Sequence, residues 1–195
     1  YGNTEKGHRT NGHTVNGGYA EYVLNHINTV YKIPSHVSFE EASLITNLGC
    51  VLYGYETLGG YIAGDKVLIT GAGPLGLAAA AAGKALCADR VYLSDVLTER
   101  LEIGKKIGAD YLINAKEEDA FEILMEETEG MGVDYAIESS GTKEGLDLAV
   151  KALKRNGKIL LLGIPHDPVP IDLKNLSLND KDIVSVRGES RTNVG

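Results

Sequence analysis

The sequence is poor in cysteine and in positive charge, and it lacks any apolar run as long as a membrane span. Its two cysteines, Cys50 and Cys87, cannot build a disulfide framework or, by themselves, a zinc site. Both lie in apolar segments with a helical pattern, so we expect small buried side chains in a protein of the reducing cytoplasm. The chain has 19 basic and 27 acidic residues and a formal net charge of −8. This balance disfavours nucleic acid and anionic membranes as main partners.

Glycine, by contrast, is abundant, with 24 of 195 residues, and three glycines have a spacing that is typical of phosphate binding. Gly71, Gly73 and Gly76 follow a short apolar run rich in β-branched residues and precede an alanine-rich segment. This pattern predicts a buried strand, a tight turn and a helix. In that context the spacing G-x-G-x-x-G predicts a pyrophosphate site at the helix N-terminus, with Pro74 and Leu75 taking part.

An acidic residue, Asp95, ends the next expected strand and lies 19 residues after Gly76. A carboxylate at this point can accept hydrogen bonds from both ribose hydroxyls of the adenosine half of a dinucleotide. Its negative charge would repel a 2′-phosphate, so the sequence favours NAD over NADP. The alternative is a glycine-rich turn of some other α/β domain, with Asp95 as a solvated strand end.

From residue 64 onward, strand patterns alternate with helical patterns across short turns. Strands are expected at 67–69, 90–95, 111–114, 133–138, 158–163 and 183–187, and helices at 75–88, 97–107, 117–128 and 143–153. Strands joined by such crossovers are mostly parallel, so the expected fold class is α/β, with a doubly wound, six-stranded Rossmann sheet of order 3-2-1-4-5-6. That order opens a ligand crevice between the first and fourth strands, at Gly71–Gly76 and Ser139–Gly141.

The start of the chain has a different character. Its first 18 residues are polar and aperiodic and begin without methionine, so we expect a piece of a longer protein. Alternating residues predict strands at 18–24 and 28–33. Ser38 and Glu41 have the spacing of a capping box, which predicts a short helix to residue 45, and a second helix is expected at 48–58.

Seven motifs in this order resemble the medium-chain dehydrogenase/reductase family, and in particular its zinc-containing alcohol and polyol dehydrogenases of the sorbitol and threonine type. The motifs are Gly17–Val23, Ala63–Val67, Gly71–Gly76, Ser94-Asp95 with Arg100, Gly108–Asp110, Gly132–Asp134 and Glu138–Gly141. The resemblance implies that residues 1–45 are the C-terminal edge of a first, β-rich GroES-like catalytic-domain segment. Residues 46–195 would be the Rossmann NAD-binding domain.

The resemblance implies an NAD-dependent oxidoreductase that transfers hydride between a secondary alcohol or polyol and NAD. In such enzymes zinc polarises the substrate alcohol. We expect zinc in the full-length protein and an inactive chain when these 195 residues stand alone. A cytoplasmic homo-oligomer, either a dimer or a tetramer, is also implied.

By the same resemblance, individual residues take roles around the dinucleotide. Arg100 would contact the adenine side, and a second group would line the crevice near the nicotinamide ribose. That group consists of Ser140, Gly141, Gly163 and Ile164. Arg191, which follows the sixth expected strand, would face the substrate, although it can equally be a solvated loop arginine.

The zinc ligands are the point at which the sequence departs from the family. One zinc-associated position, often Glu or Cys, falls on Thr46 or on Asn47, depending on how the motif is matched. Neither a hydroxyl nor an amide is a good zinc ligand, and Cys50 lies nearby but out of register. The chain alone therefore cannot hold a complete catalytic zinc, and no metal ligand is assigned in it.

Two alternatives stay open. One is a zinc-free reductase that resembles quinone oxidoreductases, a group that usually takes NADPH, which Asp95 disfavours and Thr46-Asn47 favours. The other is a regulatory module that binds NAD without turnover, since fold alone does not fix function.

Overall fold

The computed structural model describes residues 11–12, 14–27 and 30–188. The chain divides into two compact units, one of residues 1–45 and one of residues 46–194. Within the described residues, no helix has both the length and the apolar character that a membrane span requires.

The first unit contains the short helix α1 (Phe39–Ala42), which begins with the predicted capping box. The Glu41 backbone N–H donates to the Ser38 hydroxyl at 3.1 Å, and the Ser38 N–H donates to the Glu41 carboxylate at 2.8 Å. The hydrogen bond from the Ser38 N–H stabilises the charged carboxylate, so it lowers the pKa of Glu41.

The strands predicted in this unit are wrong over the described residues. No strand forms at 18–24 or at 30–33, and positions 28–29 lie outside the described residues. The large apolar side chains Tyr19, Tyr22 and Leu24 are almost fully exposed. A strand needs a neighbour to complete its hydrogen-bond ladder, and an alternating sequence pattern does not supply that neighbour.

The second unit is the predicted α/β domain. Its strands are β1 (Lys66–Thr70), β2 (Arg90–Asp95), β3 (Tyr111–Asn114), β4 (Val133–Glu138), β5 (Leu153–Leu161) and β6 (Asp182–Ser185). Its helices are α2 (Ile45–Leu58), which starts one residue before the unit, α3 (Pro74–Ala85), α4 (Thr98–Lys106), α5 (Ala120–Glu127), α6 (Lys143–Ala152) and α7 (Leu173–Leu178).

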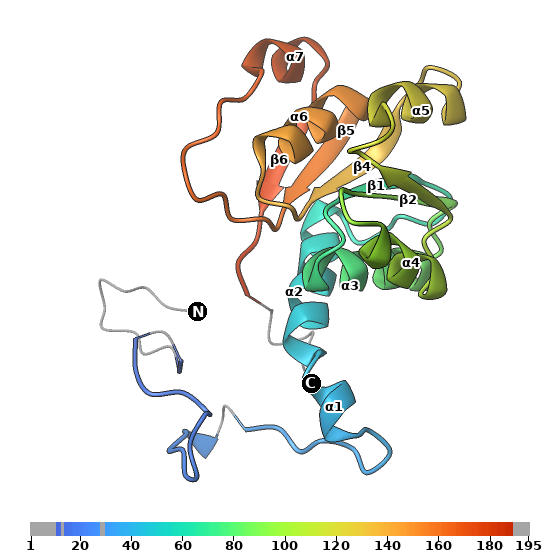
Figure 1. Ribbon diagram of the computed structural model, residues 1–195. Helices are drawn as coiled ribbons and strands as arrows, with labels where there is room; N and C mark the ends of the chain where they lie inside the picture. Colours follow the sequence, from blue (N-terminus) through green and yellow to red (C-terminus); the bar gives the residue numbers. More distant parts are fainter. Residues whose placement is uncertain (1–10, 13, 28–29, 189–195) are drawn as a thin grey trace. The chain divides into compact units, whose positions relative to one another are not determined.

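All five pairings between neighbouring strands are parallel, and the sheet order is β3-β2-β1-β4-β5-β6, as predicted (Figure 1). The chain moves outward from β1 through β2 to β3, then returns to place β4 on the free side of β1. The carboxyl ends of β1 and β4 therefore lie side by side, with the chain leaving them toward opposite halves of the sheet.

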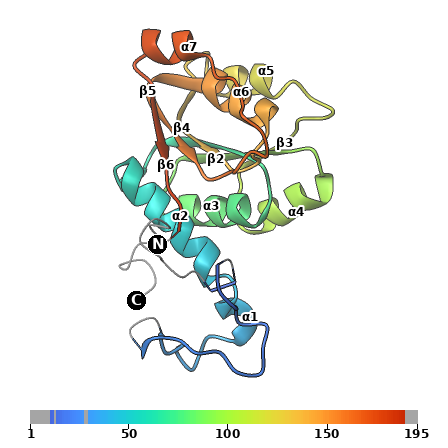
Figure 2. The same ribbon diagram turned by 90° about the vertical axis from the view of Figure 1, so that its left-hand side faces the viewer.

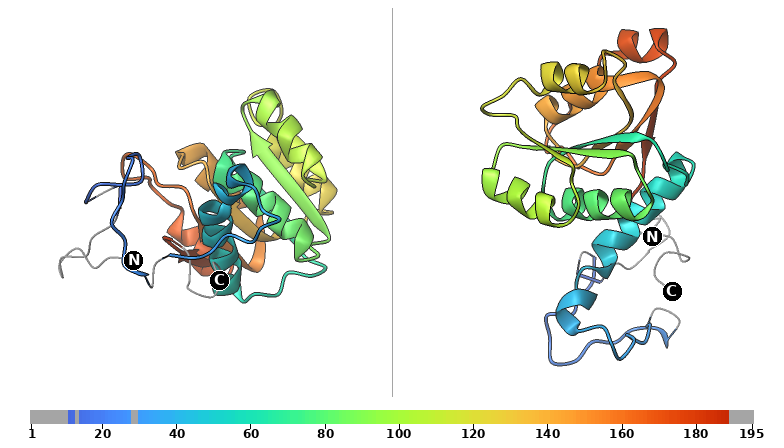
Figure 3. Two further views of the ribbon diagram at one scale, coloured as in Figure 1. Left: turned by 90° about the horizontal axis from the view of Figure 1, so that it is seen from below. Right: turned by 90° about the vertical axis from the view of Figure 1, so that its right-hand side faces the viewer.

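Helices cover both faces of the sheet (Figure 2 and Figure 3). With the strands they form two apolar cores, one on each face. Helices α2, α3 and α4 contribute to one core, and α5, α6 and α7 to the other. Successive strand residues alternate between them, so Val67 and Ile69 pack in the first core while Leu68 packs in the second. This explains why strand β1 is apolar at consecutive positions.

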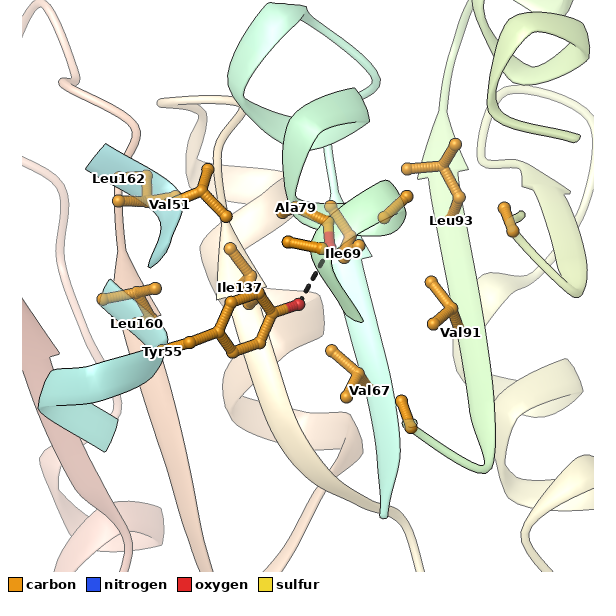
Figure 4. Packing of buried hydrophobic residues seen from close by; sticks show 14 of the residues in the cluster. Val51, Tyr55, Val67, Ile69, Ala79, Val91, Leu93, Ile137, Leu160 and Leu162 are labelled. Atoms are coloured by element: carbon orange, nitrogen blue, oxygen red, sulfur yellow. Dashed lines mark hydrogen bonds between the residues drawn. The ribbon is translucent and has the colours of Figure 1, made fainter. Parts of the chain in front are cut away.

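Tyr55 links α2 to α3 within the first core (Figure 4). Its ring is buried, and its hydroxyl donates to the Ala79 carbonyl oxygen at 2.9 Å. Burial disfavours the phenolate and raises the pKa of Tyr55.

Several elements differ from expectation. Helix α7, which the sequence analysis did not predict, begins where the Asp172 side chain accepts a hydrogen bond from the Asn175 N–H. Helix α5 starts at Ala120 rather than at 117, because Asp119 caps it. Strand β5 begins at Leu153 rather than at 158 and ends at Leu161 rather than at 163.

The expected burial of Cys87 is wrong. This residue is exposed, because it lies in the turn after α3 with a φ of 64°.

Candidate functional site: a cleft at the carboxyl ends of β1, β2 and β4

A cleft of about 270 Å³ opens where strands β1, β2 and β4 end. Its lining includes five of the predicted site residues, namely Gly71, Gly73, Asp95, Arg100 and Ser140. The sheet topology brings these residues together. Gly71, Gly73 and Ser140 lie in the turns after β1 and β4, Asp95 is the last residue of β2, and Arg100 is on α4. The cleft therefore lies at the point where the chain reverses its direction across the sheet, as parallel sheets of this kind favour for ligands.

The first wall of the cleft is the glycine turn after β1. Gly71 has a φ of 93°, and a Cβ there would lie 2.8 Å from the Ser140 backbone nitrogen. A side chain is therefore excluded both by the backbone conformation and by the neighbouring turn. At Gly76, a Cβ would collide with the Gly71 carbonyl oxygen, so the close approach there is between the helix and the turn itself.

Gly73 differs from these two glycines because a Cβ there would meet no atom within 4 Å. It is the N-cap of α3 and provides no side-chain acceptor, and Pro74 takes the first helical position, with Leu75 next to it. The N-terminus of α3 is thus bordered by open space at a residue without a side chain. An anionic group such as a pyrophosphate fits this terminus, which carries partial positive charge.

Asp95 is largely buried, and it is tied to the glycine turn rather than solvated at a strand end. One carboxylate oxygen accepts from the Ala72 N–H at 2.6 Å, and the other accepts from the Leu97 N–H at 2.9 Å. The Arg100 guanidinium lies 3.9 Å from the first of these oxygens and is half exposed. Each carboxylate oxygen keeps a further lone pair, so two hydroxyl donors of a ribose can still be accepted.

The opposite wall is the turn after β4. The Ser139 hydroxyl lies 2.9 Å from the Thr70 carbonyl oxygen and 2.9 Å from the Gly71 carbonyl oxygen, and it donates to this pair. It thereby links the end of β4 to the end of β1 directly beneath the cleft. The sequence analysis missed Ser139 as an individual site residue. It also missed Thr142, which caps α6, and Glu144 and Leu148 of α6, which line the cleft as well. Their only signal was the polar segment that follows an apolar strand.

The remaining predicted residues do not line the cleft. Gly141 and Gly163 are in the turns that follow β4 and β5, and Ile164 is strongly exposed. Arg191 lies outside the described residues.

The family's zinc does not fit the described residues. Within residues 11–12, 14–27 and 30–188, no group of three or more His, Cys, Asp or Glu side chains could hold a metal ion. Thr46 is exposed and Asn47 half-buried on α2, and both carry neutral side chains.

Comparison with known proteins agrees with this geometry. The family model described as zinc-binding dehydrogenase matches residues 74–194. L-threonine 3-dehydrogenase of Pyrococcus abyssi is 41% identical over 162 residues, which cover 83% of this chain and 46% of that protein. Sorbitol dehydrogenase of Bacillus subtilis is 33% identical over 173 residues, which cover 88% of this chain and 49% of that protein.

A similar solved structure is that of the alcohol dehydrogenase TADH from Thermus sp. ATN1. It is 28% identical, with a TM-score of 0.76 over 84% of this chain and 46% of that chain. The present chain thus spans about half the length of the relatives it matches. Since the family model covers well over half of the chain and the fold agrees, this protein belongs to the zinc-binding dehydrogenase family.

Proposed function

We propose that this chain is the dinucleotide-binding part of an NAD-dependent dehydrogenase, which transfers hydride between NAD and a secondary alcohol or polyol. The observation that supports this most is Asp95, a carboxylate fixed on the glycine turn at the rim of the cleft. A threonine dehydrogenase and a sorbitol dehydrogenase among the relatives support the substrate class.

In this proposal NAD supplies the chemistry when bound, by accepting hydride on its nicotinamide ring. The residues of this chain bind and orient it. The N-terminus of α3 with Gly71 and Gly73 would hold the pyrophosphate, and Asp95 would hold the adenosine ribose. The turn after β4 would receive the other half of the dinucleotide, because it lies across β1 from Asp95.

The proposal extends to the whole protein as the resemblance implies. Residues 1–45 would belong to a GroES-like catalytic domain and residues 46–195 to the Rossmann domain. Any zinc that assists the reaction would need ligands from outside the described residues. A homo-oligomer in the cytoplasm, a dimer or a tetramer, is part of the same proposal.

The test is calorimetric titration of the chain with NAD and with NADP. We expect NAD to bind at least about tenfold more tightly, because Asp95 would lie against the 2′-phosphate of NADP and juxtaposed like charges cost affinity. Replacing Asp95 with Asn should reduce the ratio of NAD affinity to NADP affinity. The matched control is Asp110→Asn, which changes another Asp that accepts a backbone N–H, that of Val91.

The outcomes separate the alternatives. Tighter binding of NADP would contradict the role of Asp95 and favour a reductase that resembles quinone oxidoreductases. Failure of both dinucleotides to bind the folded chain would overturn the proposed cleft.

A further inference from the structure

Glu138 is a buried acid directly beside the cleft that no step above employs. It is the last residue of β4, and only 3% of it is exposed. It does not line the cleft, whereas the two serines that follow it do. A buried carboxylate is costly unless its oxygens have donors, so its partners indicate what it does.

Three donors converge on one oxygen of this side chain, Oε1. They are the Ser140 N–H at 2.8 Å, the Gly141 N–H at 2.9 Å and the Ser140 hydroxyl. The hydroxyl in turn accepts from the Thr142 N–H at 3.2 Å. The Ser140 hydroxyl thus donates its proton to Glu138, and the same carboxylate oxygen fixes the Ser140 and Gly141 backbone N–H groups.

The other carboxylate oxygen reaches toward the next strand. A Cβ at Gly163 would collide with Oε2 of Glu138, so the absence of a side chain at Gly163 makes room for the acid. The Glu138 backbone carbonyl accepts from the N–H groups of Leu162 and Gly163, at 2.8 Å and 2.9 Å. Glu138 therefore links the turn after β4 to the loop after β5.

We propose that Glu138 is a positioning residue that orders these two turns for the nicotinamide half of the dinucleotide. This inference rests on the proposed function, since it assumes a dinucleotide whose pyrophosphate lies at α3. The sheet order places Asp95 on one side of that point and the two turns on the other. The adenosine half would then not depend on Glu138, while the nicotinamide half would.

The test compares NAD with ADP, which lacks the nicotinamide riboside, on wild type and variants of the chain. In Glu138→Ala we expect the affinity for NAD to fall by about tenfold, because the turn must be ordered on binding without its carboxylate. The affinity for ADP should stay within about twofold. Glu138→Gln should restore most of the NAD affinity, since its amide oxygen can replace Oε1 as the shared acceptor.

The matched control is Asp134→Asn, at the other end of the same strand. Asp134 also holds backbone, accepting from the Lys66 N–H at 2.8 Å, but it lies far along β4 from the cleft. We expect it to change stability without changing the ratio of NAD to ADP affinity. If Glu138→Ala does not fold, Glu138→Asp tests the same point, because its carboxylate is one methylene too short for the turn.

The failures are distinguishable. If wild type binds neither ADP nor NAD, the proposed function fails. If wild type binds both and the folded Glu138 variants keep the wild-type ratio of NAD affinity to ADP affinity, Glu138 only supports the fold and the inference is overturned.

The sequence has no tryptophan, so binding of NADH can also be followed by nicotinamide fluorescence without tryptophan overlap.

Discussion

At the scale of single residues, two buried tyrosines show how much a hydroxyl partner matters. Tyr55 and Tyr92 are both at most 1% exposed. The Tyr55 hydroxyl donates to the Ala79 carbonyl, whereas the Tyr92 hydroxyl has no hydrogen-bond partner among the described residues. A buried polar group without a partner costs free energy, and a paired one contributes modestly.

The two tyrosines should therefore respond differently to removal of the hydroxyl. We expect Tyr92→Phe to leave the free energy of unfolding unchanged or to raise it by up to about 1 kcal/mol. Tyr55→Phe should lower it by about 1 kcal/mol, because a buried carbonyl loses a donor. Urea unfolding at fixed pH measures both. Equal losses in the two variants would show that Tyr92 has a partner such as a buried water.

Sequence reasoning at this scale found the residue types but not their partners. Asp95 was predicted from its distance to the glycines, and the structure adds that its carboxylate holds the Ala72 N–H. The network of Glu138 was not predicted, although its donors lie only two and three residues further along the chain. The sequence indicates a strand end with an acid, but it does not specify the turn conformation, with a φ of 66° at Gly141, in which three donors meet one oxygen.

At the scale of elements, β1, the glycine turn and α3 form a unit that the sequence specified almost completely. The reason is that each glycine is required locally, by the left-handed φ of Gly71 or by the close contact at Gly76. Two glycines of this unit have different surroundings. A Cβ at Gly76 would collide with packed atoms, whereas a Cβ at Gly73 would enter open space.

Substitutions at the two glycines should therefore affect stability and NAD binding separately. Gly76→Ala should lower the free energy of unfolding by about 2 kcal/mol, because the added methyl overpacks against the turn. Gly73→Ala should change stability by less than about 1 kcal/mol. It should nevertheless weaken NAD binding by about tenfold or more, since its methyl would occupy cleft space. Chemical unfolding and calorimetry on both variants measure this. Strong NAD binding by Gly73→Ala would contradict the assigned pyrophosphate site.

Elements that depend on a distant partner were predicted less well. The alternation at 18–24 indicated a strand, but no neighbouring strand pairs with it in the described residues. Helix α7 was missed because it is only six residues long, too short for a periodic signal, and only its Asp172 cap indicates it.

At the scale of the whole molecule, the sheet order was predictable because alternating strands and helices admit few topologies. The division at residue 45 was predicted only through the resemblance, and the two units differ in kind. In the first unit, the described residues 14–27 and 30–38 form no α-helix and no strand. Many of their apolar side chains are exposed. The second unit has two buried cores.

Limited proteolysis should reveal this difference. We expect chymotrypsin to cut first at Tyr19, Tyr22 or Phe39, because these side chains are exposed and protease needs accessible backbone. A product containing β1 to β6 should resist further cleavage, more so with NAD present, since ligand binding stabilises the folded state. Mass spectrometry identifies the cuts. Early cleavage at buried Tyr92 instead would contradict the packed sheet.

The pairing of β1 with β4 also bears on how fast the chain folds. The hydrogen bond between the Lys66 N–H and Asp134 joins residues 68 positions apart, and the segment between them forms β2, β3 and three helices. Closing so long a loop is slow compared with forming local crossovers, so we expect this pairing to form late in folding. The cleft exists only once that closure is made. A dinucleotide would therefore bind only to chains in which β1 and β4 have paired, so its binding would report that folding is complete.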